Sequence, residues 1–150
     1  MTELELQSIE TLVSEYRKQL IEDIERRKRI CLTSNSKDKY EYYRTCIADY
    51  FGISKQKAFN IKSREDAVMF CRHALAWICK VGETSLPYNH QTLAGMMGYA
   101  SHASITYSIN EIQARLMFTH SDRVIMKNIL EVMGYELVKE GDSYTNKLKE

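Results

Sequence analysis

Residues 67–81 form a segment that is apolar on nearly every side, and this segment restricts the fold more than any other feature of the chain. If it is helical, the large side chains of Phe70, Leu75 and Trp77 lie on different faces of the helix. A helix that is hydrophobic all round has to be enclosed by other elements. The sequence therefore predicts an all-α fold, a helical bundle with this helix at its centre.

The other segments have the periodicity of amphipathic helices and end at turn residues. The predicted helices are residues 3–31, residues 39–51 ended by Gly52, a short helix capped by Ser54, and residues 122–133 closed by Gly134. Residues 135–145 alternate around a Gly-Asp pair, which predicts a small C-terminal β-hairpin. We expect three regions: 1–36, the N-terminal helix and a linker; 37–116, a helical domain; and 117–150, the last helix and the hairpin.

The first predicted helix has an apolar stripe at three- and four-residue spacing. The stripe consists of Leu6, Ile9, Val13, Tyr16, Leu20 and Ile24. Two partners fit it: a second copy of the chain, which would make a homodimer, or the rest of this chain. Four cations follow at residues 26–29, near the end of the helix where the helix dipole favours them. They fit a solvated helix end, and they also fit a contact to a nucleic-acid backbone.

Composition argues against several classes of protein. Hydrophobic residues make up 44% of the chain and charged residues 27%, which is ordinary globular composition. No apolar run approaches the roughly 20 residues that a membrane span needs, and the first residues are acidic rather than signal-like. We therefore expect a cytoplasmic protein that has no membrane partner.

Cysteine and histidine spacing gives no sign of a metal site or a disulfide framework. Cys31, Cys46, Cys71 and Cys79 form no CxxC pair, and His73, His90, His102 and His120 form no HxxxH pair. Reduced and mostly buried thiols are the simpler interpretation. The chain also has no GxxxxGK[ST] and no GxSxG motif. We expect no metal, no cofactor, no small-molecule ligand and no enzymatic activity.

Residues 89–115 have the pattern of two helices joined by a tight turn. Asn89 fits an N-cap, Gly98 supplies the turn, and Ser101 can cap the second helix. The apolar side of that helix, which should face the preceding helices, consists of Ile105, Ile109, Ile112 and Leu116. A helix-turn-helix has this form, and the first residues of its second helix meet base edges in the major groove of DNA. An ordinary antiparallel helix pair fits the same pattern.

The first turn of the second helix has chemistry that suits base contacts. Ser101, His102 and Ser104 offer hydrogen bonds, and Ala103 offers a methyl group to a thymine methyl. The net charge is only +1, but residues 37–115 carry ten basic and seven acidic side chains. A modest phosphate-facing surface is therefore expected in this region.

Residues 46–115, about half of the chain, resemble the C-terminal DNA-binding domain of DnaA, the bacterial replication initiator, which has a Trp-repressor-like helix-turn-helix. Residues 47–54 resemble its entry helix and the following turn, and residues 62–64 stand where the family has a basic loop. Arg72 and His73 stand where the family has Arg-Gln, and Lys80 stands at a basic family position. Residues 97–105 fall on the family signature Phe-Gly-Gly-Arg-Asp-His-Thr-Thr-Val.

The resemblance implies that Ser101, His102, Ala103 and Ser104 contact bases. The side chains expected at the DNA backbone or minor groove are Lys62, Arg64, Arg72, Lys80, Asn89 and Thr106. Ser101 replaces the family Asp, Ala103 and Ser104 replace its two threonines, and Asp66 stands where a groove-inserting Arg is expected. The base code of the initiator therefore does not carry over unchanged.

These observations predict a protein that binds double-stranded DNA, without ATPase activity, in replication or transcription regulation. The alternative is a protein-interaction module that keeps the fold and binds a protein partner, such as a replication or regulatory protein, instead of DNA. A DNA binder should lose affinity steeply as salt rises, whereas an apolar helix interface should not.

Overall fold

The computed structural model describes residues 2–33 and 35–149, and for residues 27–33 it describes the backbone alone. Its elements, in chain order, are α1 (Glu3–Thr33), α2 (Ser36–Phe51), α3 (Lys55–Ala58), α4 (Asp66–Lys80), the 3-10 helix η1 (Gly82–Thr84), α5 (His90–Met97), α6 (Ala103–Phe118), α7 (His120–Val132), β1 (Tyr135–Glu140) and β2 (Ser143–Leu148). The predicted class, helical with a C-terminal hairpin, is confirmed.

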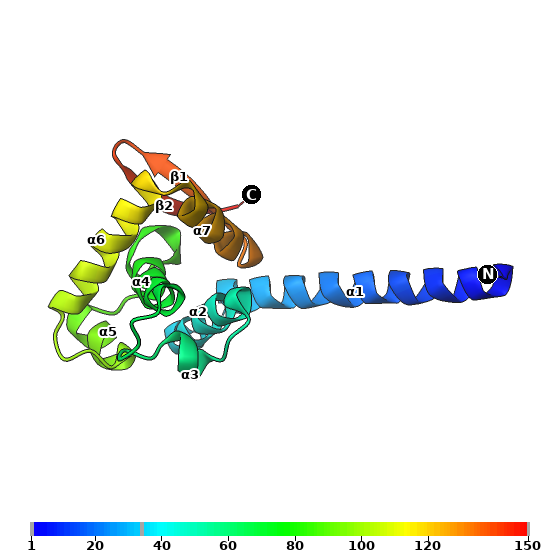
Figure 1. Cartoon of the computed structure of the whole chain (residues 1–150), viewed down its shortest axis with the longest axis horizontal. Helices are drawn as coiled ribbons and strands as arrows, with labels where there is room; N and C mark the ends of the chain where they lie inside the picture. Colours follow the sequence, from blue (N-terminus) through cyan, green and yellow to red (C-terminus); the bar gives the residue numbers. More distant parts are fainter. Residues whose placement is uncertain (1, 34, 150) are drawn as a thin grey trace.

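The elements from α2 to β2 form the body of the molecule, and helix α4 is its centre, as the all-round hydrophobicity of α4 predicted. The side chains from Ala74 to Cys79, including Leu75, Trp77 and Ile78, are at most 1% exposed. Helices α2, α3 and α6 pack around α4, and Figure 1 shows it enclosed between α2 and α6. Because α4 is held on several sides, it is a rigid reference for the elements that it touches.

Helix α1 projects away from the body as a single long helix (Figure 1). Its apolar stripe is uncovered: the six side chains from Leu6 to Ile24 in the stripe are between 39% and 66% exposed. The rest of this chain is therefore not the partner of the stripe. Of the predicted basic run at 26–29, Arg26 forms an ion pair with Asp23 at 3.0 Å, and the other three side chains lie outside the described residues.

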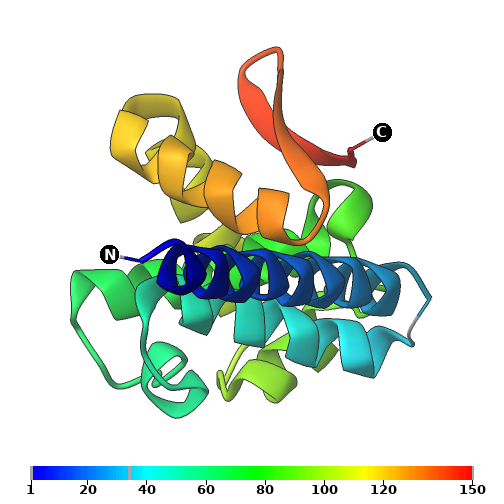
Figure 2. The same ribbon diagram turned by 90° about the vertical axis from the view of Figure 1, so that its right-hand side faces the viewer.

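The buried side chain of Asn146 attaches the C-terminal hairpin to the segment that follows α4. Strands β1 and β2 pair antiparallel, with Tyr135 opposite Leu148. Asn146 is 1% exposed; its Oδ1 accepts from the Thr84 amide at 2.9 Å, and its Nδ2 donates to the Val81 carbonyl at 2.9 Å. Figure 2 shows α7 and the hairpin at one edge of the body and α5 at the opposite edge.

The predictions of buried cysteines and of no membrane-spanning segment can be compared with the described part of the chain. Cys46, Cys71 and Cys79 are buried, as expected, whereas Cys31 lies outside the described side chains. Across residues 2–33 and 35–149, none of the helices has both the length and the apolar character that crossing a bilayer requires.

Candidate nucleic-acid interface

The predicted turn between the two helices of the motif is present, and its capping residues act as expected. The Asn89 side chain accepts from the Thr92 amide at 2.8 Å and so caps α5. Gly98 has a φ of +84°, in the left-handed region, and the Tyr99 amide donates to the Ala94 carbonyl at 2.8 Å. This is the closed C-terminal turn that a glycine permits. Helix α5 is thereby stopped, and the chain turns toward α6.

Helix α6 begins later than predicted: its N-cap position is His102, whose side chain makes no cap hydrogen bond, and the predicted cap residue Ser101 precedes it. The helix is assigned from Ala103, and His102 already has helical angles of −62° and −22°. The Ser101 hydroxyl accepts from the Ala103 amide at 3.2 Å, so it gives a partner to one of the free N–H groups at the start of the helix. Ser101, His102 and Ala103 are exposed, and Ser104 is half-buried. The four predicted base-contacting residues therefore stand together at an open helix N-terminus.

The apolar side of α6 faces α4, as predicted. Ile105, Ile112 and Leu116 are 0% exposed, and Ile109 is half-buried. Ser108 belongs to this side as well, and a hydrogen bond of 2.8 Å joins its Oγ to Nδ1 of His73 on α4. Thr106 lies one turn after His102 and is exposed with it. The polar face of α6 therefore points away from the core.

The basic loop between α3 and α4 is held in place by a buried arginine. Arg72 is 4% exposed, and its guanidinium donates to the Asn60 carbonyl at 3.0 Å and to the Ser63 carbonyl at 3.3 Å. Contact of Arg72 with the DNA backbone stays a prediction; in the structure this side chain is enclosed and bonded to the loop. It positions Lys62 and Arg64, both of which are exposed.

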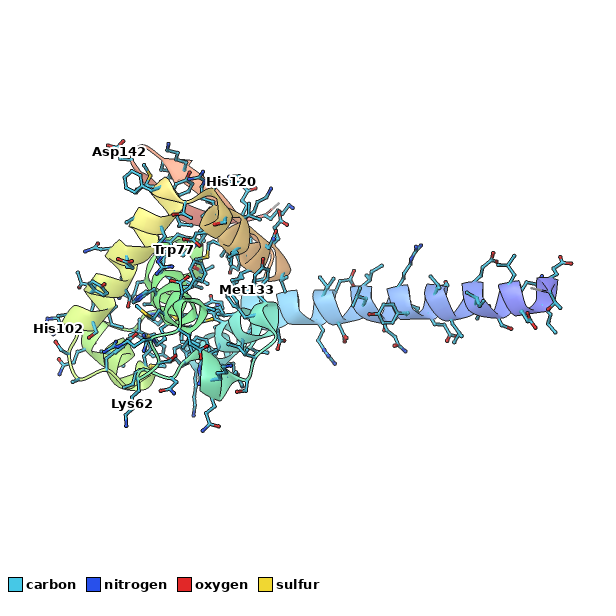
Figure 3. The ribbon with its side chains drawn as sticks, in the orientation of Figure 1. Lys62, Trp77, His102, His120, Met133 and Asp142 are labelled. Carbon is cyan, nitrogen blue, oxygen red and sulfur yellow. The ribbon has the colours of Figure 1, made fainter. Side chains whose placement is uncertain are left out.

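The loop and the first turn of α6 meet across a surface depression of about 400 Å³. Its lining includes Arg64 from the loop, Arg72 from α4, and Ser104 and Tyr107 from α6. Figure 3 shows Lys62 and His102 at the same end of the body, away from His120 and Asp142. The two groups of residues that the sequence assigned to bases and to phosphates are thus adjacent, although they lie about forty residues apart in the chain.

His73 lies under this depression as a neutral core residue. Burial of its ring, together with the guanidinium groups of Arg115 and Arg72, lowers the pKa of the imidazole from 6.5 to about 4. The Tyr107 ring packs edge-on against it, with 5.7 Å between ring centroids. His73 therefore supports the wall of the depression and stays uncharged near neutral pH.

Acidic groups stand next to the basic loop and reduce its charge. Asp66, at the start of α4, has a side chain that is 86% exposed and lies 3.3 Å from the guanidinium of Arg115. Arg115 also contacts Glu111 at 3.5 Å and Asp122 at 4.0 Å, so its charge is shared among three carboxylates. Burial raises the pKa of Asp122, partly offset by Arg115. Exposed Glu65 adds a further negative charge.

Lys80 and Asn89, also predicted to contact the DNA backbone, form hydrogen bonds within the protein. The Lys80 ammonium donates to the Tyr88 carbonyl at 2.6 Å and ties the segment before α5 to the end of α4. The Asn89 side chain is occupied by its cap hydrogen bond. Sequence reasoning missed the part played by Asn60, whose carbonyl holds Arg72 and whose Oδ1 accepts from the Lys62 amide at 3.0 Å. A turn-favouring Asn just before the basic residues was the signal that could have indicated it.

Within the part of the chain that the structure describes, no group of three His, Cys, Asp or Glu side chains is arranged to hold a metal ion. No protein-family model matches the chain, and a search of the curated proteins finds no match.

Proposed function

We propose that this protein binds double-stranded DNA through a DnaA-like helix-turn-helix. The observation that carries the proposal is the position of the exposed first turn of α6 beside an exposed basic loop that Arg72 holds in place. In this proposal α6 enters the major groove and the loop follows the neighbouring backbone. The protein would act in the cytoplasm, without ATPase activity, in replication or transcription regulation.

The four residues of the first turn have separate roles in this proposal. Ser101, Ser104 and His102 donate to or accept from base edges, and Ala103 contacts a thymine methyl. Lys62 and Arg64 contact phosphates or the minor groove, and Thr106 contacts the backbone one turn along α6. Only two exposed cations are assigned to phosphate, with Glu65 and Asp66 close by. We therefore expect one copy of the protein to bind DNA with modest affinity.

A protein partner is the second candidate, and the apolar side chains at the rim of the same surface favour it. Tyr107 is 60% exposed and Ile61 is 38% exposed, and both line the depression. In this version the helix-turn-helix keeps its fold and presents these side chains to a replication or regulatory protein. Salt separates the two candidates, because contacts to phosphate weaken as counterions compete and apolar contacts do not.

The test is selection of bound duplexes from a random library, followed by retention measurements at several salt concentrations. We expect enrichment of a short motif, loss of base preference in His102→Ala, and weaker binding of all sequences by Lys62→Ala. His120→Ala and Lys127→Ala are the matched controls, since both residues are exposed on α7. If the wild type enriches no sequence and shows no salt-dependent retention, DNA binding is rejected. If only Lys62→Ala has an effect, binding stands and the base-contacting role is rejected.

A further inference from the structure

The uncovered stripe of α1 has the arrangement of a coiled-coil seam. With Leu6 as the first a position, the a positions are Leu6, Val13 and Leu20, and the d positions are Ile9, Tyr16 and Asp23. Five of these six are large apolar or aromatic side chains with 45% to 66% exposure. An isolated helix gets little stability from its own hydrogen bonds, so a long helix with a bare apolar seam needs something to cover that seam.

Charges beside the seam are segregated along the helix. The flanking e and g positions carry Glu5 and Glu10 in the first half and Arg17 and Arg26 in the second half. Glu10 and Arg17 make no ion pair with any residue that the structure describes. Seven residues of helix separate them by about 10 Å, which is too far for a direct pair within one helix. Both are therefore available to a partner.

This charge order selects the orientation of a second copy. In a parallel pair, Glu5 would face Glu10 of the second copy, and the two Asp23 carboxylates would meet in the seam. In an antiparallel pair in which residues 9 and 20 face each other, Glu10 faces Arg17 of the second copy and Glu5 faces Arg26. Symmetry makes each of these attractive pairs occur twice. The apolar layers then join Ile9 to Leu20 and Val13 to Tyr16.

The surface of α1 has room for that packing. An open groove of about 310 Å³ is lined by Ile9, Glu10, Val13, Ser14 and Arg17. In the antiparallel register the ring of Tyr16 from the second copy enters beside Val13, between the two charged residues. The groove therefore has an apolar floor, with an acidic residue at one end and a basic residue at the other end of the same side. A second copy turned by a twofold axis places its basic end against the acidic end of the first.

We propose that two copies of this protein pair antiparallel along residues 3–26 of α1, about a twofold axis between Ser14 and Glu15. This proposal does not depend on DNA binding. From the axis to the end of α1 is 18 to 19 residues, so the two helix ends lie roughly 55 Å apart, on opposite sides of the axis. The two bodies are consequently held apart, whereas a parallel pair would bring them side by side.

Charge reversal tests the pairing and its direction. Sedimentation equilibrium of the full chain should show a dimer whose dissociation constant rises about tenfold or more in Glu10→Arg and in Arg17→Glu, because each change places like charges face to face twice. The double variant E10R/R17E should return to within about threefold of the wild type, and an equimolar mixture of the two single variants should form heterodimers. Lys18→Glu, the same charge change on the outer face, should leave the constant unchanged.

Cysteine crosslinking provides an independent measure of direction, in a background where Cys31 is replaced by Ser. A mixture of Ile9→Cys and Leu20→Cys chains should form a disulfide between the two, and neither chain should crosslink to itself. Tighter association of Glu10→Arg, or self-crosslinking of Leu20→Cys, would establish the parallel pair instead. A chain that remains monomeric at its highest soluble concentration would overturn the proposal. Circular dichroism of each variant verifies that α1 is still helical.

Discussion

At the residue scale, two neighbours on α4 connect the core to the proposed DNA surface. Arg72 holds the basic loop through two carbonyl oxygens, and His73 holds α6 through Ser108. Both side chains are only 4% exposed, and both belong to the lining of the depression. They act by fixing the positions of Lys62 and Arg64 on one side and of Ser104 and Tyr107 on the other.

The first prediction is that burial of His73 makes the stability of the fold depend on pH. The folded chain keeps His73 neutral down to a pKa of about 4, and the ordinary value is 6.5. Between these values the unfolded chain binds a proton that the folded chain does not. The stability that His73 contributes is therefore present above pH 6.5 and is lost as the pH falls toward 4, by up to about 3 kcal/mol.

Chemical denaturation at several pH values, comparing the wild type with His73→Asn, measures this effect. His73→Asn should have a lower free energy of unfolding than the wild type at neutral pH. This difference in unfolding free energy should narrow or reverse as the pH falls toward 4. His120→Asn, a change at an exposed histidine, should follow the wild type. Parallel curves for the wild type and His73→Asn would show that His73 does not titrate as described.

The second prediction concerns Arg72 as a positioning residue. Arg72→Met keeps much of the side-chain volume and removes both hydrogen bonds to the loop, at a cost of about 1–3 kcal/mol in unfolding free energy. Hydrogen exchange should quicken at the amides of residues 60–64 more than at those of α2. If exchange there is unchanged, the loop is held by other contacts and the assignment of Arg72 is wrong.

At the element scale, the turn between α5 and α6 sets the direction of the helix that is proposed to enter the groove. The third prediction compares two glycines of that unit. Gly98→Ala should destabilise the protein by about 1–2 kcal/mol, because a φ of +84° strains any residue with a Cβ. Gly95→Ala should be neutral or stabilising by up to about 1 kcal/mol, since Gly95 lies within α5 with nothing within 4 Å of an added Cβ.

Thermal or urea denaturation of the two variants decides the comparison. Equal effects at the two positions would mean that the left-handed turn does not form in solution. A loss at Gly98 accompanied by weaker DNA retention would connect the turn to the proposed function, because the α6 axis would then be misdirected.

Local signals explain which elements could be predicted from the sequence. The all-round hydrophobicity of α4, the cap at Asn89 and the turn at Gly98 depend on residues close together in the chain, and each is confirmed. The roles of Arg72 and Asn146 could not be predicted in this way. Their partners are carbonyl and amide groups that lie 9 to 65 residues away, and only the folded arrangement brings them together.

The candidate site was predictable in part for the same reason. The first turn of α6 could be identified from its cap and its apolar stripe, and the basic loop from its charges. Whether the two would be neighbours depended on how α4 and α6 pack, which no local pattern states. The family resemblance placed Arg72 and Lys80 among the contacts to the DNA backbone or minor groove, and in the structure both use their charged groups to hold backbone carbonyls.

At the scale of the whole molecule, the body and α1 raise separate questions of partner. The body presents the proposed DNA surface at one end, and α1 leaves from another part as an uncovered helix (Figure 1). The heptad pattern of α1 was compatible with packing inside the chain or between chains, and the structure removes the first alternative. If two copies pair as proposed, each dimer carries two DNA surfaces held well apart, which suits separated sites better than adjoining half-sites.

The central claim is DNA binding by the α6 first turn and the loop, and the salt dependence of duplex affinity tests it most directly. For a duplex retained by the wild type, fluorescence anisotropy over a range of salt concentrations gives the slope of log binding constant against log salt concentration. The magnitude of this negative slope should be smaller by about 1 in Lys62→Ala and by about 1 in Arg64→Ala. Lys127→Ala should leave the slope unchanged. A slope near zero for the wild type, or equal slopes in all four proteins, would contradict the account.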